Sequence, residues 1–298
     1  MKQTFKLYNL GRITWWKTQA VYTALAMLGR NAVVFCEPDR PFYCLGYHQN
    51  AAELLDQEYC EANKIPVIQR QLGGGLVYLH PGQFFYQVIM PKTSRFFTMN
   101  RAVFYRRFLL PVAEALQDLG VPANYQPIAD IWVEGRKISG NGAGEIGSGV
   151  VISGNVLASF DVQGFLAGLR CQSPLWTQVI REEVQRLVGL PGGINLDYEQ
   201  VVTAIGKRYT QILGELVPAE IDGELAAKIS QIGENYQAWQ WAAPLKKASG
   251  RRFAIFKVTE AVNVDYTSLC RFGLRWDLVG VRRQDSYIRI VAGKGGFC

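Results

Sequence analysis

Three consecutive glycines interrupt an apolar, strand-like part of the sequence, in the stretch QLGGGLVYLHPGQ at residues 71–83. Strands avoid glycine because it has no side chain to pack and loses the most backbone freedom on ordering. An isolated GGG would be read as an ordinary bulge or turn. Arg70 before the glycines and Gly82 after them instead favour a loop whose free amides face an anion or an extended chain.

Several common site types are excluded by spacing. The glycines form neither a GK[ST] phosphate loop nor a GxGxxG dinucleotide turn. The chain has only two histidines, His48 and His80, and its six cysteines are too scattered for a CxxC zinc pattern or a disulfide scaffold. We therefore expect no metal site built from side chains.

Composition indicates a globular protein with an anionic partner. A hydrophobic content of 49% over 298 residues can fill the core of one large domain or two ordinary ones. The net charge of +7 favours an anionic partner, but the basic residues never form a run, so we do not expect nucleic-acid binding. No apolar run suits a membrane span or a secretory signal, so we expect a cytoplasmic monomer with reduced thiols and no membrane association.

Hydrophobic periodicity predicts a mixed α+β protein. Helices are expected at 13–30, 51–63, 99–120, 178–190, 196–216 and 222–239. Strands are expected at 32–38, 41–48, 64–72, 84–91, 130–139, 150–160, 251–264, 271–281 and 286–293, with a glycine-rich connection at 140–149. The pattern predicts a mixed-sheet catalytic domain at 1–215 and a small C-terminal α/β unit at 216–298.

A second motif, VEGRKISGNGAG at residues 133–144, places Lys137 on a strand beside glycine-rich backbone. An inward lysine would be costly unless it met a negative charge, and an outward, solvated lysine is the alternative. The two interpretations are equally good for this segment alone. A glycine platform with one strand lysine suits a substrate that passes from carboxylate through a mixed phosphoric anhydride to an amide, because positive charge must follow the reacting oxygens.

Together the motifs resemble the biotin/lipoate protein ligase superfamily, specifically its lipoate-protein ligase A and octanoyltransferase branch. Its ligases carry an arginine-rich Gly-Gly-Gly strand, a later GRKISG lysine motif, and a His-Gly-Thr stretch followed by an aspartate. Segments 70–83, 135–140 and 153–161 resemble these motifs, and LGYHQN at 45–50 resembles a GxxQ strand end. The resemblance implies the α+β fold of that superfamily.

The resemblance implies, as the leading hypothesis, a lipoate-protein ligase that uses MgATP to convert lipoic or octanoic acid to an acyl-adenylate. The acyl group would then pass to a lysine of a lipoyl-carrier domain. Lys137 would neutralise the phosphate and the reacting carbonyl, Arg70 would hold the adenylate or carboxylate, and Asp130 would meet the adenine amine or the incoming lysine. The other implied substrate contacts are Leu72, Gly73, Gly74, Gly75, Tyr78, His80, Gln83, Ser139, Gly140, Ser153, Gly154 and Asn155.

The octanoyltransferase branch offers a second reading. LGGGLVYLHPGQ resembles its RGGxxTYHGPGQ motif without a gap, and that branch moves octanoyl from acyl carrier protein through a cysteine thioester, without ATP. Its cysteine lies ten residues after a comparable aspartate, as Cys171 does after Asp161. A thiolate stabilised by Lys137 could accept the acyl group. An incidental thiol is the plainer interpretation of Cys171, because the glycine that usually follows the cysteine is absent.

Two further observations bear on the choice. QAWQWAAPL at 237–245, followed by RRFAIFKVTEAV, resembles the start of the accessory domain that the ligases carry, which favours ATP-dependent chemistry. The sequence departs from the ligase motifs, with Leu72 at the position of a small hydroxyl residue before the glycines and Ser153 at the histidine of His-Gly-Thr. These departures permit a third hypothesis, a non-catalytic homologue that binds lipoyl domains.

Overall fold

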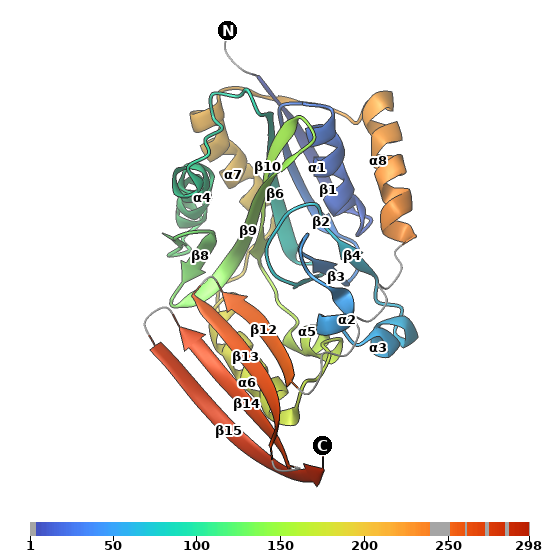
Figure 1. Cartoon of the computed structure of the whole chain (residues 1–298). Helices are drawn as coiled ribbons and strands as arrows, with labels where there is room; N and C mark the ends of the chain where they lie inside the picture. The colour runs from blue at the N-terminus through green and yellow to red at the C-terminus, as the bar shows by residue number, and fades with distance from the viewer. Residues whose placement is uncertain (1–3, 239–250, 260, 272–273, 284–285, 298) are drawn as a thin grey trace. The chain divides into compact units, whose positions relative to one another are not determined.

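The structure is a computed structural model that describes residues 4–238, 251–259, 261–271, 274–283 and 286–297 (Figure 1). Its contacts divide the chain into two compact units. Unit 1 comprises Met1–His48, Pro66–Phe160 and Gly189–Trp239, and unit 2 comprises Gln49–Ile65, Asp161–Val188 and Gln240–Cys298. Among the described helices, none is both long and apolar enough to cross a bilayer.

An eight-stranded mixed sheet forms the centre of unit 1, in the order β11-β1-β2-β6-β10-β9-β8-β7. β1 is parallel to both of its neighbours, and all the other pairs are antiparallel. The strands are β1 (Phe5–Ile13), β2 (Ala32–Pro38), β6 (Gln83–Pro91), β7 (Asn124–Gln126), β8 (Asp130–Val133), β9 (Arg136–Ile146), β10 (Gly149–Leu157) and β11 (Leu216–Pro218).

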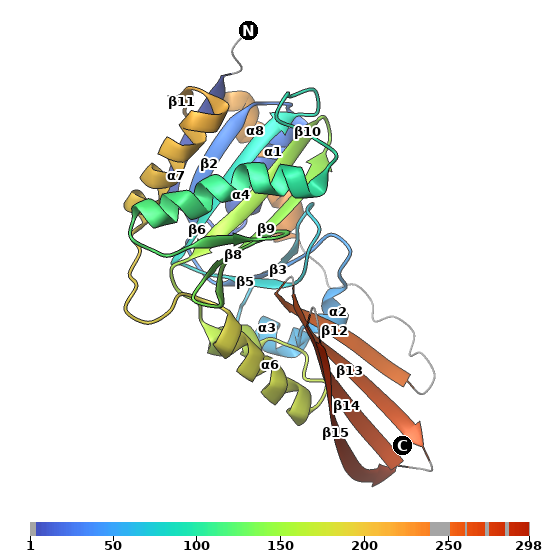
Figure 2. The ribbon, with the colours of Figure 1, turned by 90° about the vertical axis from the view of Figure 1, so that its left-hand side faces the viewer.

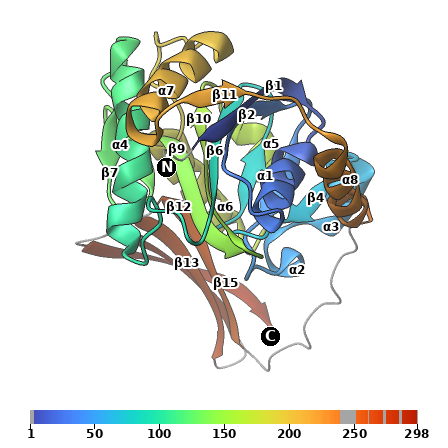
Figure 3. The ribbon, with the colours of Figure 1, turned by 90° about the horizontal axis from the view of Figure 1, so that it is seen from above.

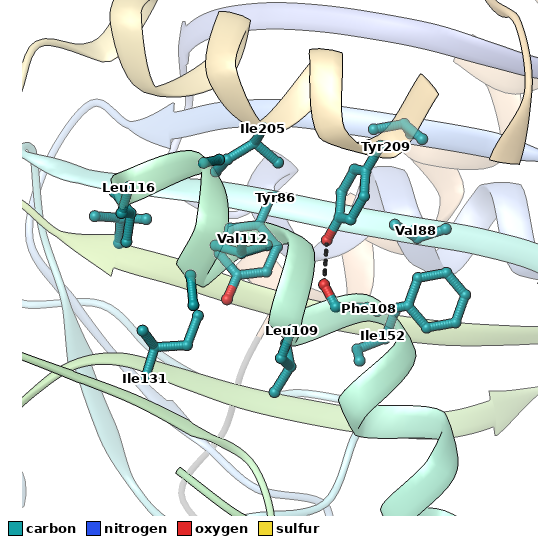
Figure 4. Packing of buried hydrophobic residues seen from close by; sticks show 14 of the residues in the cluster. Tyr86, Val88, Phe108, Leu109, Val112, Leu116, Ile131, Ile152, Ile205 and Tyr209 are labelled. Atoms are coloured by element: carbon teal, nitrogen blue, oxygen red, sulfur yellow. Dashed lines mark hydrogen bonds between the residues drawn. The ribbon is translucent and has the colours of Figure 1, made fainter. Parts of the chain in front are cut away.

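Two helix pairs cover the opposite faces of this sheet, as Figures 2 and 3 show. α4 (Arg101–Asp118) and α7 (Tyr198–Leu213) lie on one face, and α1 (Lys17–Met27) and α8 (Gly223–Gln237) lie on the other. Beneath α4 and α7, aromatic and branched side chains fill the first core, where the Tyr209 hydroxyl donates to the Phe108 carbonyl at 3.2 Å (Figure 4). Side-chain alternation along the central strands therefore assigns each strand residue to one of two helix layers.

A three-stranded sheet packs against the α1 face and carries the glycine loop. Its strands are β3 (Phe42–Leu45), β4 (Val67–Gln69) and β5 (Val77–Leu79), in the order β4-β3-β5. Cys44, Ile68 and Leu79 belong to the same apolar cluster as Ile89 and Val151 of the large sheet. The three glycines lie in the connection from β4 to β5, so this packing holds them over the large sheet.

Unit 2 combines short helices with an antiparallel sheet. Aromatic packing holds α5 and α6 against β12, with the Phe256 ring 5.6 Å from Phe165 and 6.2 Å from Trp176. The elements are α2 (Ala51–Leu54), α3 (Gln57–Ala62), α5 (Val162–Ala167), α6 (Pro174–Leu187), β12 (Arg251–Thr259), β13 (Val262–Arg271), β14 (Leu274–Arg283) and β15 (Ser286–Phe297).

The α+β class predicted from the sequence is confirmed, with corrections to individual elements. The glycine-rich segment 140–149 is not a connection, because β9 continues through it to Ile146. The strand expected at 130–139 is two strands that turn at Glu134 and Gly135, both with positive φ. The expected helix at 51–63 is two short helices, the expected strand at 251–264 is two strands, and β1, β5, β7, β11 and α5 were not predicted.

The two compact units do not follow one boundary in the chain. β11 and α8 come after residue 215 yet lie in unit 1, whereas segments 49–65 and 161–188 lie in unit 2. A catalytic part at 1–215 with an accessory part at 216–298 stays a prediction about function. The expected accessory-domain start at 237–245 lies, beyond residue 238, outside the described residues.

The contact between α8 and Trp16 gives a test of the fold. A Cβ atom at Gly233 would lie 2.3 Å from the Trp16 ring, so Gly233→Ala should lower the free energy of unfolding by about 1–3 kcal/mol through overpacking. Gly223→Ala on the same helix is the matched control, since a Cβ there meets nothing within 4 Å. Urea denaturation of both variants checks this, and equal stability of the two would contradict the packing of α8.

Candidate functional site

A β-bulge determines the direction of Lys137. Consecutive residues of β8 pair with Lys137 and Ser139, so Ile138 has no partner on that strand. Strict alternation would place residues 137 and 140 on opposite faces of the sheet. The extra residue reverses this, and Lys137 comes to lie on the same face as Gly140.

A buried carboxylate fixes the Lys137 amine. Asp130 is the partner of Gly140 across the β8–β9 pair, so its side chain lies on that same face. Its Oδ1 atom is 2.8 Å from the Lys137 Nζ atom, and the side chains of Asp130 and Lys137 are 1% and 18% exposed. The inward interpretation of Lys137 therefore holds, with Asp130 supplying the negative charge that a buried lysine needs.

Alternate glycines leave this face of β9 without side chains: Gly140, Gly142 and Gly144. The Lys137 Nζ atom lies 3.2 Å from the position that a Cβ at the first of them would take. A Cβ at Gly142 would lie 3.5 Å from the Gly73 carbonyl oxygen, and a Cβ at Gly144 would lie 3.1 Å from the Leu72 Cδ2 atom. The lysine and the triple-glycine loop thus lie side by side on one bare strand face.

The loop is wrapped around Arg70. One guanidinium nitrogen, Nη2, donates to the carbonyls of Gly73 and Gly75 at 2.9 and 3.0 Å, and Nη1 donates to the Cys44 carbonyl at 3.0 Å. Gly74 has φ +103° and its carbonyl oxygen lies 2.0 Å from a Cβ position at Gly46. Bare backbone is needed here because the loop closes around an arginine and lies directly on a strand end.

This geometry changes the expectation for Arg70. The sequence predicted that Arg70 would hold an adenylate or a carboxylate, whereas in the structure it donates to carbonyls of its own loop. Arg70 therefore shapes the glycine loop in the free protein. A direct contact with a ligand stays a prediction.

A chain of hydrogen bonds joins the lysine strand to the segment after the glycines. Asn155 is the partner of Gly140 on β10, and its Nδ2 donates to Gln83 Oε1 at 2.9 Å. The Gln83 Nε2 atom donates in turn to the Tyr78 carbonyl at 3.1 Å. Ser153, the β10 partner of Gly142, lies on the same face. These residues, all predicted from the sequence, come together around the bare face.

The turn at residues 80–82, just before Gln83, is held by a residue that the sequence did not single out. The Gly82 amide donates to Glu37 Oε2 at 3.0 Å, and the other carboxylate oxygen accepts from Arg12 at 3.0 Å. Gly82 has φ +86°, and a Cβ there would lie 2.3 Å from the Ser159 hydroxyl. In a single sequence, Glu37 is indistinguishable from a surface carboxylate at a strand end.

His80 lies beside this turn. Its Nδ1 atom is 2.7 Å from the Pro81 carbonyl oxygen, and its ring centroid is 5.8 Å from that of Tyr78 and 6.2 Å from that of Phe160. The ring is therefore held in an aromatic group, and its predicted contact with a substrate stays a prediction.

Two of the expected contacts lie on the opposite face. The Ser139 hydroxyl is buried, 2.7 Å from the Tyr86 hydroxyl, and also accepts from Asn141 Nδ2. A Cβ at Gly154 would lie 1.8 Å from Asn141 Oδ1, so this glycine makes room for the cluster. Burial raises the pKa of Tyr86, which keeps it a hydrogen-bond donor. Ser139 and Gly154 therefore lie on the face that α4 and α7 cover, opposite the face that carries Lys137.

Cys171 belongs to unit 2, whereas Lys137 belongs to unit 1. The Cys171 thiol is exposed, with its Sγ atom 3.2 Å from the Thr177 hydroxyl. Cys36, Cys44 and Cys60 are buried, and burial raises the pKa of Cys60 to about 12. The structure does not bring Cys171 and Lys137 together within one compact unit.

Residues 15–209 match the family model of the lipoyl protein ligase A/B catalytic domain. The chain belongs to this family. Among its relatives, Lipoate–protein ligase 1 of Staphylococcus aureus is 28% identical over 68% of this chain and 61% of that protein. Octanoyltransferase LipM of an Exiguobacterium is 37% identical over 27% of this chain and 29% of that protein. Membership in this family identifies an enzyme of the lipoate-protein ligase and octanoyltransferase kind. The relatives include both a lipoate-protein ligase and an octanoyltransferase.

Solved structures agree on the fold. A bipartite lipoate protein ligase of Thermoplasma acidophilum has a TM-score of 0.71 at 18% identity, over 80% of this chain and 96% of that chain. A lipoate-protein ligase A bound with ATP has a TM-score of 0.66 at 20% identity, over 80% and 98%. The chain nevertheless spans only 61% of the length of the S. aureus ligase and 30% of the length of LplJ of Bacillus subtilis.

The difference in burial between Cys171 and the three buried cysteines gives a test of the structure. Iodoacetamide should alkylate Cys171 in the native protein well before Cys36, Cys44 or Cys60, since buried thiols are shielded from the reagent. Peptide mass mapping over time measures the order, and urea-unfolded protein is the control in which the four react together. Early native labelling of Cys44 would contradict the packed β3 strand beneath the glycine loop.

Proposed function

We propose that this chain is a lipoate-protein ligase that uses ATP to activate lipoic or octanoic acid and passes the acyl group to a lysine of a lipoyl-carrier domain. The observation that carries the proposal is the position of the Lys137 amine beside the triple-glycine loop, on one bare face of β9. The family membership supports it.

The two steps of the proposed reaction place negative charge where Lys137 could meet it. A carboxylate oxygen of the acid attacks the α-phosphorus of ATP, which forms the acyl-adenylate and releases pyrophosphate. The carrier amine then attacks the acyl carbonyl, forms the amide and releases AMP. An ammonium group has three N–H donors, so the ion pair with Asp130 does not use all of them. The remaining donors can follow the phosphate and carbonyl oxygens.

The residues around the lysine suit both ends of such a substrate. Ser153, Asn155 and Gln83 supply polar groups on the face that Gly140 and Gly142 leave bare. Leu72 and Tyr78 are buried at the glycine loop, where a fatty chain would gain about 0.8 kcal/mol per buried methylene. Mg²⁺ would arrive with ATP, and we assign no side chain to it.

Relatives support the choice of substrates. One neighbour is a lipoate-protein ligase A bound with ATP, another is described with bound lipoic acid, and a third comes from a structural analysis of a bipartite lipoate protein ligase and its E2 lipoyl domain. We extend these ligands to the present chain as part of the proposal. Its cytoplasmic location and monomeric state stay predictions.

Octanoyl transfer through Cys171 is the second candidate function. The octanoyltransferase relative and the exposed thiol favour it. In this reaction the thiolate would attack the thioester of octanoyl-acyl carrier protein and release the carrier thiol, and the acceptor lysine would then displace the cysteine.

Replacement of the ion pair tests the proposed function. Lys137→Ala/Asp130→Asn avoids leaving a buried carboxylate unpaired, and should lower acyl transfer by about 100-fold or more. The assay follows the mass of an apo lipoyl domain incubated with octanoate and ATP. Lys207→Ala, an exposed lysine on α7, is the control and should keep full activity.

The same assay separates the alternatives. Transfer only from octanoyl-acyl carrier protein, abolished by Cys171→Ser, would replace the ligase by the transferase. Binding of the lipoyl domain without transfer from either donor would indicate a non-catalytic binder. Full turnover by the double variant would refute the role of Lys137 in either reaction.

A further inference from the structure

The Asn155 side chain belongs to a polar row that crosses three strands of the large sheet. The strand register places Asp130 of β8, Gly140 of β9 and Asn155 of β10 opposite one another on one face. The Lys137 Nζ atom lies 3.2 Å from a Cβ position at Gly140, so the amine occupies the space over this glycine. Directly opposed side chains on neighbouring strands are about 5 Å apart, so Asn155 borders the same space.

The side-chain amide of Asn155 has a fixed polarity. A backbone carbonyl oxygen can only accept a hydrogen bond, so the 3.1 Å contact of Gln83 with the Tyr78 carbonyl must be made by the Gln83 Nε2 atom. The Gln83 Oε1 atom therefore faces Asn155 and accepts from its Nδ2 atom at 2.9 Å. Rotation of either amide by a half-turn would bring two oxygens together. The Tyr78 carbonyl thus determines which end of the Asn155 amide faces Gln83.

This chain of donors leaves the Asn155 Oδ1 atom as an acceptor. No residue in the described part of the chain donates a hydrogen bond to it, although Asn155 is only 8% exposed. The second Nδ2 hydrogen can meet an oxygen of a bound adenylate, whereas Oδ1 can take only an N–H or O–H group. Carboxylate and phosphate oxygens are acceptors themselves when ionised, so they do not suit this atom.

We propose that the Asn155 Oδ1 atom accepts a hydrogen bond from the attacking amine of the carrier lysine and so orients this amine for acyl transfer. The other donors in the reaction are the ribose hydroxyls and the adenine amine, which the phosphate separates from the acyl carbonyl. The attacking nitrogen must instead reach the carbonyl carbon itself, beside the Lys137 amine. The place of Asn155, one strand from that amine, favours the nucleophile. This inference rests on the proposed function.

A neutral acceptor suits the amide-forming step. The amine nitrogen forms a bond to the acyl carbon, the bond from this carbon to the phosphate oxygen breaks, and AMP leaves with the electron pair. One amine proton passes to water. A carboxylate in place of Asn155 would favour the protonated amine, which has no lone pair for the attack. The Asp130 carboxylate on the same face is already paired with Lys137.

Separate assays of the two half-reactions test the role of Asn155. Asn155→Ala should slow transfer from synthetic octanoyl-adenylate to a saturating apo lipoyl domain by about 100-fold, because the amine loses its orientation. Adenylate formation, measured as ATP–pyrophosphate exchange with octanoate, should fall at least tenfold less than transfer does. The control is Asn9→Ala, which removes an asparagine that accepts from Tyr198 at 2.8 Å on β1 and should leave both rates unchanged.

A double-mutant cycle tests the fixed polarity. Gln83→Leu frees the Asn155 amide to rotate and should slow transfer by about fivefold to tenfold, which makes Gln83 a positioning residue. Asn155→Ala/Gln83→Leu should be no slower than Asn155→Ala alone, because no amide is then left to orient. The double variant also leaves no Gln83 amide unpaired, so it measures the loss of Asn155 even if Asn155→Ala does not fold. Thermal melting establishes which variants are folded.

Three results would overturn the role of Asn155. Equal losses in the two half-reactions, with a raised KM for ATP, would assign the Oδ1 atom to the nucleotide. Losses that multiply in the double variant would mean that the two amides act separately. Transfer at the wild-type rate by Asn155→Ala would show that the amine needs no such acceptor.

Failure of the proposed function would give a different result. Wild-type protein that shows neither ATP–pyrophosphate exchange with octanoate nor transfer from octanoyl-adenylate would refute the ligase proposal and the role of Asn155 together. Wild-type exchange and transfer, with equally fast transfer by Asn155→Ala, would keep the ligase and refute only the role of Asn155.

Discussion

The ion pair between Lys137 and Asp130 is the interaction on which the site depends. Asp130 is buried, so its charge must be balanced, and the bulge at Ile138 is what allows Lys137 to reach it. Without that extra residue, alternation would direct the amine toward the opposite layer, where Tyr86 and the α4 and α7 helices fill the space. One irregularity in one strand pair thus selects the face on which chemistry can occur.

The structural role of each glycine follows from the atoms that lie against it. Those of β9 leave room for the Lys137 amine, for the Gly73 carbonyl and for Leu72, while Gly74 and Gly46 allow the loop to close on Arg70 and on the end of β3. A Cβ at any of the tight positions would separate the loop from the strand. The loop and the lysine strand are therefore parts of one surface, although the sequence separates them by about sixty residues.

Local chemistry explains which features the sequence could predict. The lysine, the glycines and the pairing of Gln83 with Asn155 follow from motifs whose residues are unusual in strands, so they could be identified before the fold was known. The sequence could not predict that β9 continues through residues 140–146, because a glycine-rich segment is typical of a connecting loop. Only the three-dimensional structure shows that these glycines make room for the loop that lies against them. Ser139 was assigned to the substrate side because a bulge cannot be read from the alternation of one strand. Gly154 was assigned there together with Ser153 and Asn155, although regular alternation on β10 places it on the opposite face from both. Glu37 and Asn141 act through partners distant in sequence, which no local pattern reveals.

The most direct test of the account is a crystal structure with a non-hydrolysable octanoyl-adenylate analogue, in which a sulfamoyl group replaces the phosphate. We predict this group over the bare face at Gly140, within hydrogen-bonding distance of the Lys137 amine, with the octanoyl chain against Leu72. An analogue bound elsewhere, with the Lys137–Asp130 pair unchanged and no ligand on that face of β9, would contradict it.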